Sequence, residues 1–455
     1  MRRLVLCLAL LVSLPAVAQD SLNASRPQAA LARKHIVAAA HPLAAEAGLA
    51  MLRQGGSAVD AAVAVQAMLS LVEPQSSGIG GGALMLYRNA ADGRITAWDG
   101  RETAPAAAQP GLFLRDGQPM PFHDAVLSGR SIGVPGAIAM LEAAHKESGR
   151  LPWAKLFEPA IKAAREGFRV SARLAGAIAD DADRLRRNPS TRDYFFSPAP
   201  LANDPVPLPE GTVLRNPALA DTLQAIADGG AAALLRGPIA SDIAAAVRNY
   251  GEGGLMTTDD LAGYAPKRRQ PVCGPYRLYI VCGFPPPSSG GLVICEILNV
   301  LEGYPISYLG YGSAETTRLM VEAMRHAFVD RNTALGDPDF VDNPVEKLTS
   351  KAYAEEIRAR IDPYRAGVSE DLRPAGATES TETTHYSIID KDGNAVAVTY
   401  TLNGSFGTGK VAEGTGILLN NEMDDFTSKP GVPNLYGLVQ GEANAIEPGK
   451  SPLSS

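Results

Sequence analysis

The chain has 455 residues, of which 45% are hydrophobic and 20% are charged, a composition that is ordinary for a globular protein with a sizeable core. Its formal net charge of −7, without any run of Lys or Arg, argues against a nucleic-acid-binding surface. Beyond the first residues, no apolar stretch reaches the roughly 18 residues that a membrane-spanning helix needs.

Residues 1–18 have the three parts of a secretory signal peptide. Arg2 and Arg3 form a short positive region, the stretch 4–14 is apolar but too short to span a bilayer comfortably, and Ala16-Val17-Ala18 fits the A-x-A cleavage pattern. A buried N-terminal helix is the alternative interpretation. We therefore expect a mature chain that begins near Gln19 and works in the periplasm or outside the cell.

Periodic apolar residues predict helices in chain order at 42–53, 58–72, 137–147, 156–166, 216–228, 240–249, 292–302 and 315–331. Strands are expected at 83–87, 95–99, 384–389 and 395–402, the first two and the last two each joined as a hairpin. A further strand leads from Arg277 into the proline-rich loop that ends at Gly291. Residues 373–382 contain no large apolar residue and are expected to form a linker.

The glycine-rich segment GIGGGA, residues 78–83, matches the pattern of a dinucleotide-binding turn. Such a site needs a strand, then the glycines, then a helix whose N-terminus meets the pyrophosphate, whereas here a helix precedes and a strand follows. Nucleotide binding is therefore not expected. Two interpretations remain open: a tight turn where backbones pack closely, or a loop whose N–H groups line a ligand pocket.

Three cysteines follow the predicted signal peptide, namely Cys273, Cys282 and Cys295. In an exported protein, a turn at Gly274-Pro275 would allow Cys273 and Cys282 to form a disulfide; the alternative is that they are small buried residues. No C-x-x-C pair and no histidine spacing suits zinc. We therefore expect neither a metal site nor a cofactor.

A hydroxyl nucleophile is suggested by the boundary at Thr383, where a polar segment meets a predicted strand. Hydroxyl groups need a base, and no histidine stands in a G-x-S-x-G-like context; His385 adjoins Thr384, but neighbouring strand residues point to opposite faces. Cleavage before a threonine supplies a base differently, because the new α-amine titrates near pH ~7.7–8 on the same residue as the hydroxyl. Thr383 has the setting that this requires, and the alternative is an ordinary loop that enters a strand.

Several longer motifs resemble the γ-glutamyltranspeptidase family, whose members are also called glutathione hydrolases. Those after the predicted linker are TTHYSIIDKDGNAVAVTYTLNGSFGTG (383–409), GILLNNEMDDF (416–426) and KPGVPNLYGL (429–438). Those before it are GGSAVDAAVAVQAML (55–69), GIGGGALMLY (78–87), DGRETAP (99–105), PPPSSGG (285–291) and LGDPDF (335–340). The resemblance runs in order from about Arg33 to the last residue.

The resemblance implies an α+β fold of the N-terminal-nucleophile hydrolase type, an αββα sandwich in which two stacked sheets lie between helical layers. It also implies a precursor that cleaves itself between Glu382 and Thr383. Residues 19–382 would be the large subunit and 383–455 the small subunit of a heterodimer, both within one domain. The implied donors are glutathione and other γ-glutamyl compounds, whose γ-glutamyl group passes through an ester on Thr383 to water, an amino acid or a peptide.

Roles for individual residues also follow from the resemblance. Thr383 is expected to be the nucleophile, oriented by the hydroxyl of Thr401. Arg101 would hold the carboxylate of the donor in a charge-assisted pair, with Ser454 and Ser455 beside it.

The remaining implied site residues surround the ammonium group of the donor, and they are Asn403, Glu422 and Asp425. Some members of the family carry glutamine where this chain has Glu422, which changes the charge but keeps an acceptor. Residues 430–441 resemble the lid loop of the family, with Tyr436 as its gate residue.

In the family, the small subunit continues past the motif in which this sequence ends, and the continuation supplies a glycine pair that forms the oxyanion hole. We therefore expect the sequence to be C-terminally incomplete. Two other functions remain open: an acylase on the same fold that removes glutaryl or β-lactam side chains, and an inactive truncated product. The polar cluster at 403, 422 and 425 favours the γ-glutamyl function, because a glutaryl group has no ammonium to pair with its acids.

Overall fold

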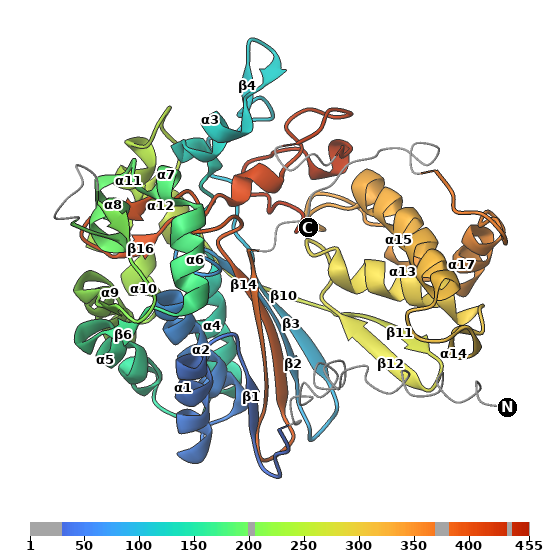
Figure 1. Ribbon diagram of the computed structural model, residues 1–455, viewed down its shortest axis with the longest axis horizontal. Coiled ribbons are helices and arrows are strands. Elements are labelled where there is room, and N and C mark those ends of the chain that lie inside the picture. Colours follow the sequence, from blue (N-terminus) through green and yellow to red (C-terminus); the bar gives the residue numbers. More distant parts are fainter. Residues whose placement is uncertain (1–29, 199–204, 369–381, 435–438, 455) are drawn as a thin grey trace, which may run out of the picture. The chain divides into compact units, whose positions relative to one another are not determined.

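The computed structural model describes residues 30–198, 205–368, 382–434 and 439–454 (Figure 1). The predicted signal peptide and nearly all of the predicted linker lie outside these residues, as do Tyr436 and Ser455. The chain divides into a short unit, Met1–Lys34, and a large unit, His35–Ser455, to which all features below belong.

The main sheet of the large unit has six antiparallel strands that come from distant parts of the chain. In spatial order they are β1 (Ile36–Ala38), β13 (Thr384–Ile389), β14 (Ala395–Thr401), β2 (Gly82–Arg88), β3 (Ile95–Gly100) and β10 (Lys267–Arg269). The two predicted hairpins, β2–β3 and β13–β14, are confirmed and lie side by side in the sheet, because β14 pairs with β2 (Figure 1). Buried and exposed residues alternate along β13, as expected for a strand with one face on a core.

Helices cover one face of this sheet and share an apolar core with it. α1 (Pro42–Arg53) and α2 (Ala58–Val72) have the predicted bounds, and every residue of α2 is buried. Ser57 and Asp60 form a capping box at the start of α2, which satisfies two N–H groups that would otherwise lack partners. Both the local cap and burial in the core therefore stabilise this first helix pair.

α2 packs on α4 (Ala137–Ser148) and on α5 (Glu158–Glu166). The inward side chains of the β13–β14 hairpin, among them Tyr386 and Tyr400, belong to the same core. The Tyr386 hydroxyl donates to the side chain of Gln66 on α2 at 2.7 Å, so the hairpin is tied to the helix by a buried polar contact as well as by packing.

A second group of helices packs around a small hairpin. β11 (Val272–Tyr276) and β12 (Tyr279–Gly283) lead into α13 (Gly290–Glu302), which packs on α15 (Ala314–Ala334) and α17 (Lys351–Arg358). Phe284 at the start of the loop before α13 contacts Leu84 and Ala97, on the sheet face opposite to α2. The expected α+β class is confirmed, and β11–β12 is a much smaller second sheet than the αββα expectation suggested.

The remaining elements are short or peripheral to the site. The helices are α3 (Phe122–Val126), α6 (Ala172–Asp180), α7 (Ala182–Leu185), α8 (Pro189–Phe195), α9 (Pro217–Gly229), α10 (Ala231–Leu235), α11 (Pro238–Arg248), α12 (Thr258–Gly263), α14 (Ile306–Leu309) and α16 (Val345–Leu348). Two-residue strands pair as β4 (Leu114–Arg115) with β5 (Gln118–Pro119), β6 (Phe168–Arg169) with β9 (Val213–Leu214), β7 (Phe196–Ser197) with β8 (Val206–Pro207), and β15 (Val411–Ala412) with β16 (Ile417–Leu418). The 3-10 turns are η2 (Gly129–Ser131), η3 (Trp153–Phe157), η5 (Glu422–Asp425) and η6 (Glu442–Asn444).

Cys273 and Cys282 form a disulfide, one of the two alternatives left by the sequence, but the turn predicted at Gly274-Pro275 is wrong. Both of those residues lie within β11, and the chain reverses at Arg277 and Leu278. Arg277 adopts a φ of 53°, the left-handed conformation that two-residue hairpin loops favour because it matches the twist of the strands. Cys295 is a buried thiol outside this pair.

No helix among the described residues is both long enough and apolar enough to cross a membrane.

Candidate active site

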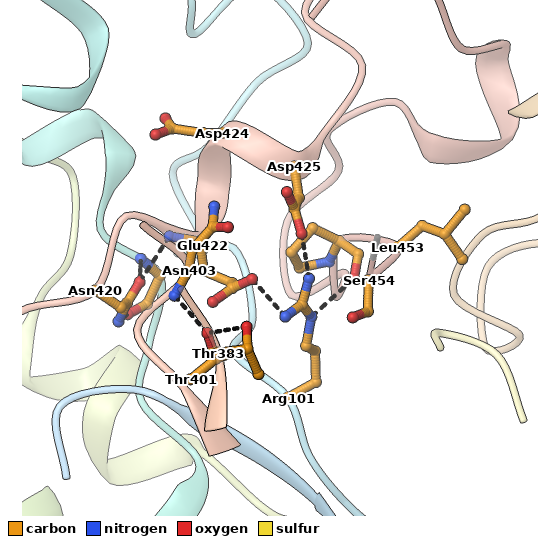
Figure 2. A network of polar contacts seen from close by, with 12 residues as sticks. Arg101, Thr383, Thr401, Asn403, Asn420, Glu422, Asp424, Asp425, Leu453 and Ser454 are labelled. Atoms are coloured by element: carbon orange, nitrogen blue, oxygen red, sulfur yellow. Dashed lines mark hydrogen bonds and ion pairs between the residues drawn. The ribbon is translucent and has the colours of Figure 1, made fainter. Parts of the chain in front are cut away.

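The β13–β14 hairpin brings the two threonines of the predicted site together. Thr383 is exposed and immediately precedes β13, and its Oγ1 lies 3.1 Å from Oγ1 of Thr401 at the end of β14 (Figure 2). Thr401 Oγ1 also accepts from the backbone N–H of Asn403 at 2.8 Å. With that N–H bound, Thr401 Oγ1 can either donate its own proton to Thr383 or accept the proton of Thr383, and the contact holds the two hydroxyl groups in a fixed relation.

Asn403 lies where the chain leaves β14 and turns back toward η5. Its backbone φ is 74°, a conformation that asparagine tolerates better than most residues, and its side-chain Nδ2 donates to the carbonyl of Asn421 at 3.0 Å. The turn therefore brings the residues after β14 next to those just before η5, where Glu422 and Asp425 lie.

The glycine-rich segment before β2 packs closely against the backbone of the segments that carry the site residues. A Cβ at Gly80 would collide with the carbonyl of Leu418, and a Cβ at Gly81 would collide with the carbonyl of Thr401. Gly82 lines the pocket described next. Close backbone packing is thus the correct interpretation of these glycines, and one of them also borders the site.

A pocket of about 230 Å³ opens in front of Thr383. It is lined by Gly82, Ala83, Leu84, Arg101, Thr383, Thr399, Thr401, Asn403, Glu422, Asp425 and Ser454. Every predicted site residue that the structure describes is therefore in this lining. Ser455 and Tyr436 lie outside the described residues.

Arg101 is the charged centre of the pocket and is 3% exposed. Its guanidinium forms ion pairs with Glu422 and, at 2.6 Å, with Asp425, and its Nε donates to the carbonyl of Pro452 at 3.1 Å (Figure 2). Burial opposes the charge on Arg101, but attraction to Glu422 and Asp425 outweighs it and raises the pKa of the guanidinium. The sequence interpretation put the arginine and the acids around opposite groups of a ligand; here they contact one another directly.

Ser454 is held by its backbone beside Arg101. Its N–H donates to the carbonyl of Pro287 at 2.7 Å, and its carbonyl accepts from Ser289 at 3.1 Å and from Arg331 at 3.0 Å. The proline-rich loop before α13 and the helix α15 thus position the last described residue of the chain at the pocket. No local sequence pattern predicts this support.

Two further residues of the site were missed by sequence reasoning. The side-chain amide of Asn420 donates to the carbonyls of Gly80 and Gly133, both at 2.8 Å, and its Oδ1 accepts from the N–H of Glu422 at 3.0 Å, so it fixes the start of η5. Glu102 is fully buried behind the pocket. A charged residue next to Arg101 in a polar loop motif looks like a solvated surface residue, and no local pattern distinguishes the two cases.

No group of three or more His, Cys, Asp or Glu side chains in the described part of the chain is arranged to hold a metal ion.

Comparison with solved structures defines the class of fold. The gamma-glutamyltranspeptidase of Helicobacter pylori matches with a TM-score of 0.71 and 37% identity, covering 76% of this chain and 97% of that one. The cephalosporin acylase of Bacillus halodurans matches with a TM-score of 0.76 and 31% identity, covering 94% of this chain and 76% of that one. The fold is that of the N-terminal-nucleophile hydrolases.

Sequence comparison then narrows the class to one family. The family described as Gamma-glutamyltranspeptidase matches residues 44–455. The glutathione hydrolase proenzyme of Escherichia coli K12 is 45% identical over 431 residues, 93% of this chain and 72% of that protein. The acylase ACY 1 proenzyme of Pseudomonas sp. SE83 is 39% identical, over 91% of this chain and 72% of that protein. The chain belongs to the γ-glutamyltranspeptidase family, and it is an enzyme.

Proposed function

We propose that this protein is a self-cleaving γ-glutamyltransferase and glutathione hydrolase whose nucleophile is Thr383. The observation that carries the proposal is the pocket that contains both Thr383 and a buried set of one arginine and two acids, Arg101, Glu422 and Asp425. The head of a γ-glutamyl group carries one carboxylate and one ammonium, so its charges are complementary to this set.

Self-cleavage comes first. The Thr383 hydroxyl attacks the carbonyl carbon of Glu382, the peptide nitrogen takes up a proton and leaves as the α-amine of Thr383, and water hydrolyses the resulting ester. Residues 19–382 become the large subunit and 383–455 belong to the small subunit of a heterodimer. The exposed position of Thr383 and its 3.1 Å contact with Thr401 support this assignment.

The α-amine released by cleavage then acts as the base of the enzyme. It takes the hydroxyl proton as Thr383 attacks the γ-carbonyl of the donor, and it returns the proton to the departing amine. The γ-glutamyl ester on Thr383 is resolved by water or by the amino group of an amino acid or peptide. Because the amine titrates near pH ~7.7–8, a large part of it is neutral at physiological pH.

Donor binding exchanges the ion pairs that exist in the empty pocket. The donor carboxylate forms an ion pair with the guanidinium of Arg101, with the hydroxyl groups of Ser454 and Ser455 beside it. The donor ammonium then pairs with Glu422 and Asp425, the two acids that Arg101 contacts in the empty pocket. Asn403 completes the ammonium site. This exchange keeps each buried charge paired, which matters because a buried unpaired charge is costly.

Three further features belong to the proposal. Tyr436 gates the pocket as part of a lid that limits access of water. The N-terminal residues direct export to the periplasm or the medium. Donors are glutathione and other γ-glutamyl compounds, and acceptors are amino acids or dipeptides.

The second candidate is an acylase that removes glutaryl or β-lactam side chains, because acylases are among the relatives and structural neighbours of this chain. The test compares γ-glutamyl and glutaryl anilides, which differ only in the ammonium group. We expect kcat/KM for the γ-glutamyl anilide to be at least about 100-fold higher, since each unpaired buried acid costs roughly 1–3 kcal/mol. An equal or greater kcat/KM for the glutaryl anilide would establish the acylase instead.

A further inference from the structure

Glu102 is a buried acid that the proposed mechanism does not use. It follows Arg101 in the loop after β3, and its side chain has no exposed surface. A Cβ at Gly82 would collide with the Glu102 carboxylate, so this carboxylate lies directly behind the glycine that lines the pocket. Because Glu102 lies next to the donor site, its protonation state affects the charge that a donor meets there.

Among the described residues, neither carboxylate oxygen of Glu102 has a hydrogen-bond partner, and the same is true of Oε2 of Glu422 and Oδ1 of Asp425. Two ionised carboxylates only accept hydrogen bonds, so they cannot bond to each other. One proton between them changes this, because a protonated carboxyl donates to its neighbour. A proton shared by Glu102 and Glu422 gives both acids a partner, whereas Asp425 already has one in its ion pair with Arg101.

The charges around Glu102 lead to the same result. The groups that face it are Arg101 on its own loop, Glu422 and Asp425 on η5, Tyr400 on β14 and Tyr264 after α12. Burial raises the pKa values of both tyrosines well above their usual range, so these phenols stay neutral. One arginine then faces three carboxylates, and the buried cluster has an excess of negative charge unless it holds a proton.

The titration of the two acids agrees with this geometry. Burial raises the pKa of Glu102 to about 7, against the attraction of Arg101 and the smaller effects of its own backbone N–H and of the neighbouring Glu422 carboxyl. Burial, together with repulsion from Glu102 and Asp425, also raises the pKa of Glu422 well above its usual range, against the attraction of Arg101.

We propose that Glu102 and Glu422 share one proton in the empty enzyme, and that the ammonium group of the donor displaces it, so that donor binding releases a proton to solvent. The inference rests on the proposed function, because it concerns the same pocket. Glu102 does not contact the donor. It is a positioning residue that acts through the proton it shares with Glu422. A ligand without an ammonium leaves the proton in place, so the pair favours γ-glutamyl over glutaryl compounds.

The proposal gives the donor affinity a defined pH dependence. Below pH 7, protons compete with the ammonium, and affinity falls by about tenfold for each pH unit. Once the pH is high enough to remove the shared proton, affinity levels off. The effect appears in KM rather than in kcat, because the competition is for the empty pocket.

The test is calorimetry of the full-length wild-type protein with L-glutamate as the probe, in two buffers of different ionisation enthalpy. The difference between the two observed enthalpies gives the number of protons released. We expect close to one proton at pH 6 and close to none at pH 8.5. Glutarate is the matched ligand without the ammonium, and we expect it to release none at either pH.

Variants show whether the released proton comes from the acid pair or from another titrating group, such as the α-amine of Thr383. Glu102→Gln keeps the size of the side chain and donates to Glu422, so it should abolish the release and flatten KM against pH between 6 and 8. Asp424→Asn is the control, because Asp424 is also a buried acid but points away from the pocket (Figure 2). It should release the same number of protons as the wild type.

Two results would overturn the proposal. A wild-type protein that binds L-glutamate at pH 6 without releasing a proton overturns the proposal, as does a Glu102→Gln variant that releases as many protons as the wild type. If Glu102→Gln does not fold, the wild-type KM decides, and a KM that stays constant between pH 6 and 8 overturns the proposal. A wild type that turns over no γ-glutamyl anilide at all refutes the proposed function, a result distinct from normal turnover with a KM that does not vary with pH.

Discussion

At the scale of single residues, Thr401 connects the nucleophile to the strand that supports it. Its hydroxyl contacts Thr383 at 3.1 Å and accepts from the N–H of Asn403 at 2.8 Å, and the residue is only 8% exposed. The hydroxyl therefore orients both the reacting group and the turn that leads to the acids. Neither contact can be made by a side chain of the same shape without an oxygen.

Replacing Thr401 by valine tests this role. Thr401→Val keeps the branched shape but removes the hydroxyl, which leaves the N–H of Asn403 without its acceptor. We expect a loss of roughly 1–3 kcal/mol in transition-state stabilisation, or about 5- to 150-fold in kcat for a γ-glutamyl anilide. Thr401→Ser, which retains the hydroxyl, should stay within a few fold of wild type. Wild-type kcat in Thr401→Val would show that the hydroxyl contributes nothing.

At the scale of elements, α13, α15 and α17 enclose a second buried acid away from the pocket. Glu296 on α13 is 1% exposed, and neither of its carboxylate oxygens has a hydrogen-bond donor among the described residues. Asp330 on α15 lies beside it and accepts from the hydroxyl of Tyr353 on α17 at 2.7 Å. Burial, together with repulsion from Asp330, raises the pKa of Glu296 to about 9.

The sign of the stability effect follows from that pKa. Between about pH 4.5 and 9 the folded protein keeps a proton on Glu296 that the unfolded chain gives up, so the free energy of unfolding falls as pH rises. The slope from this one group reaches about 1.4 kcal/mol per pH unit. Glu296→Gln should remove that contribution and be more stable than wild type at pH 8, with a smaller gain at pH 5.

Urea denaturation at the two pH values measures this difference. Glu356→Gln is the control, because Glu356 is an exposed residue of α17 and its loss should change the free energy of unfolding by less than about 0.5 kcal/mol at either pH. A Glu296→Gln variant that is less stable than wild type at pH 8 would show that Glu296 is ionised and stabilising in the folded protein.

At the scale of the whole molecule, the sequence predicted local features well and long-range contacts poorly. The bounds of α1 and α2 and the β13–β14 hairpin follow from apolar periodicity, from the Ser57 cap and from a glycine turn, all of which act within a few residues. Strands β1 and β10 were missed, because three residues carry too little pattern and form only against an existing sheet edge.

The site shows the same division between local and long-range information. Thr383 was predicted from a local boundary, and the resemblance to the family supplied the other residues. The ion pair between Arg101 and Asp425 joins residues 324 positions apart, so no local pattern encodes it. Glu102 was missed because its burial depends on Gly82 and Gly133, which come from other segments. Charge in a polar loop motif does not distinguish a solvated acid from a buried one.

The proposed function depends on Thr383, which cleaves the chain before itself and then carries the γ-glutamyl group. The most direct measurement is the intact mass of the fragments from purified wild type and from Thr383→Ala, with Thr384→Val as the control. Thr384 is buried, and its hydroxyl has no partner among the described residues, so its loss should not affect cleavage. We predict two fragments from the wild type and the control, the second beginning at Thr383, and one uncleaved chain from Thr383→Ala. Two such fragments from Thr383→Ala would contradict the claim.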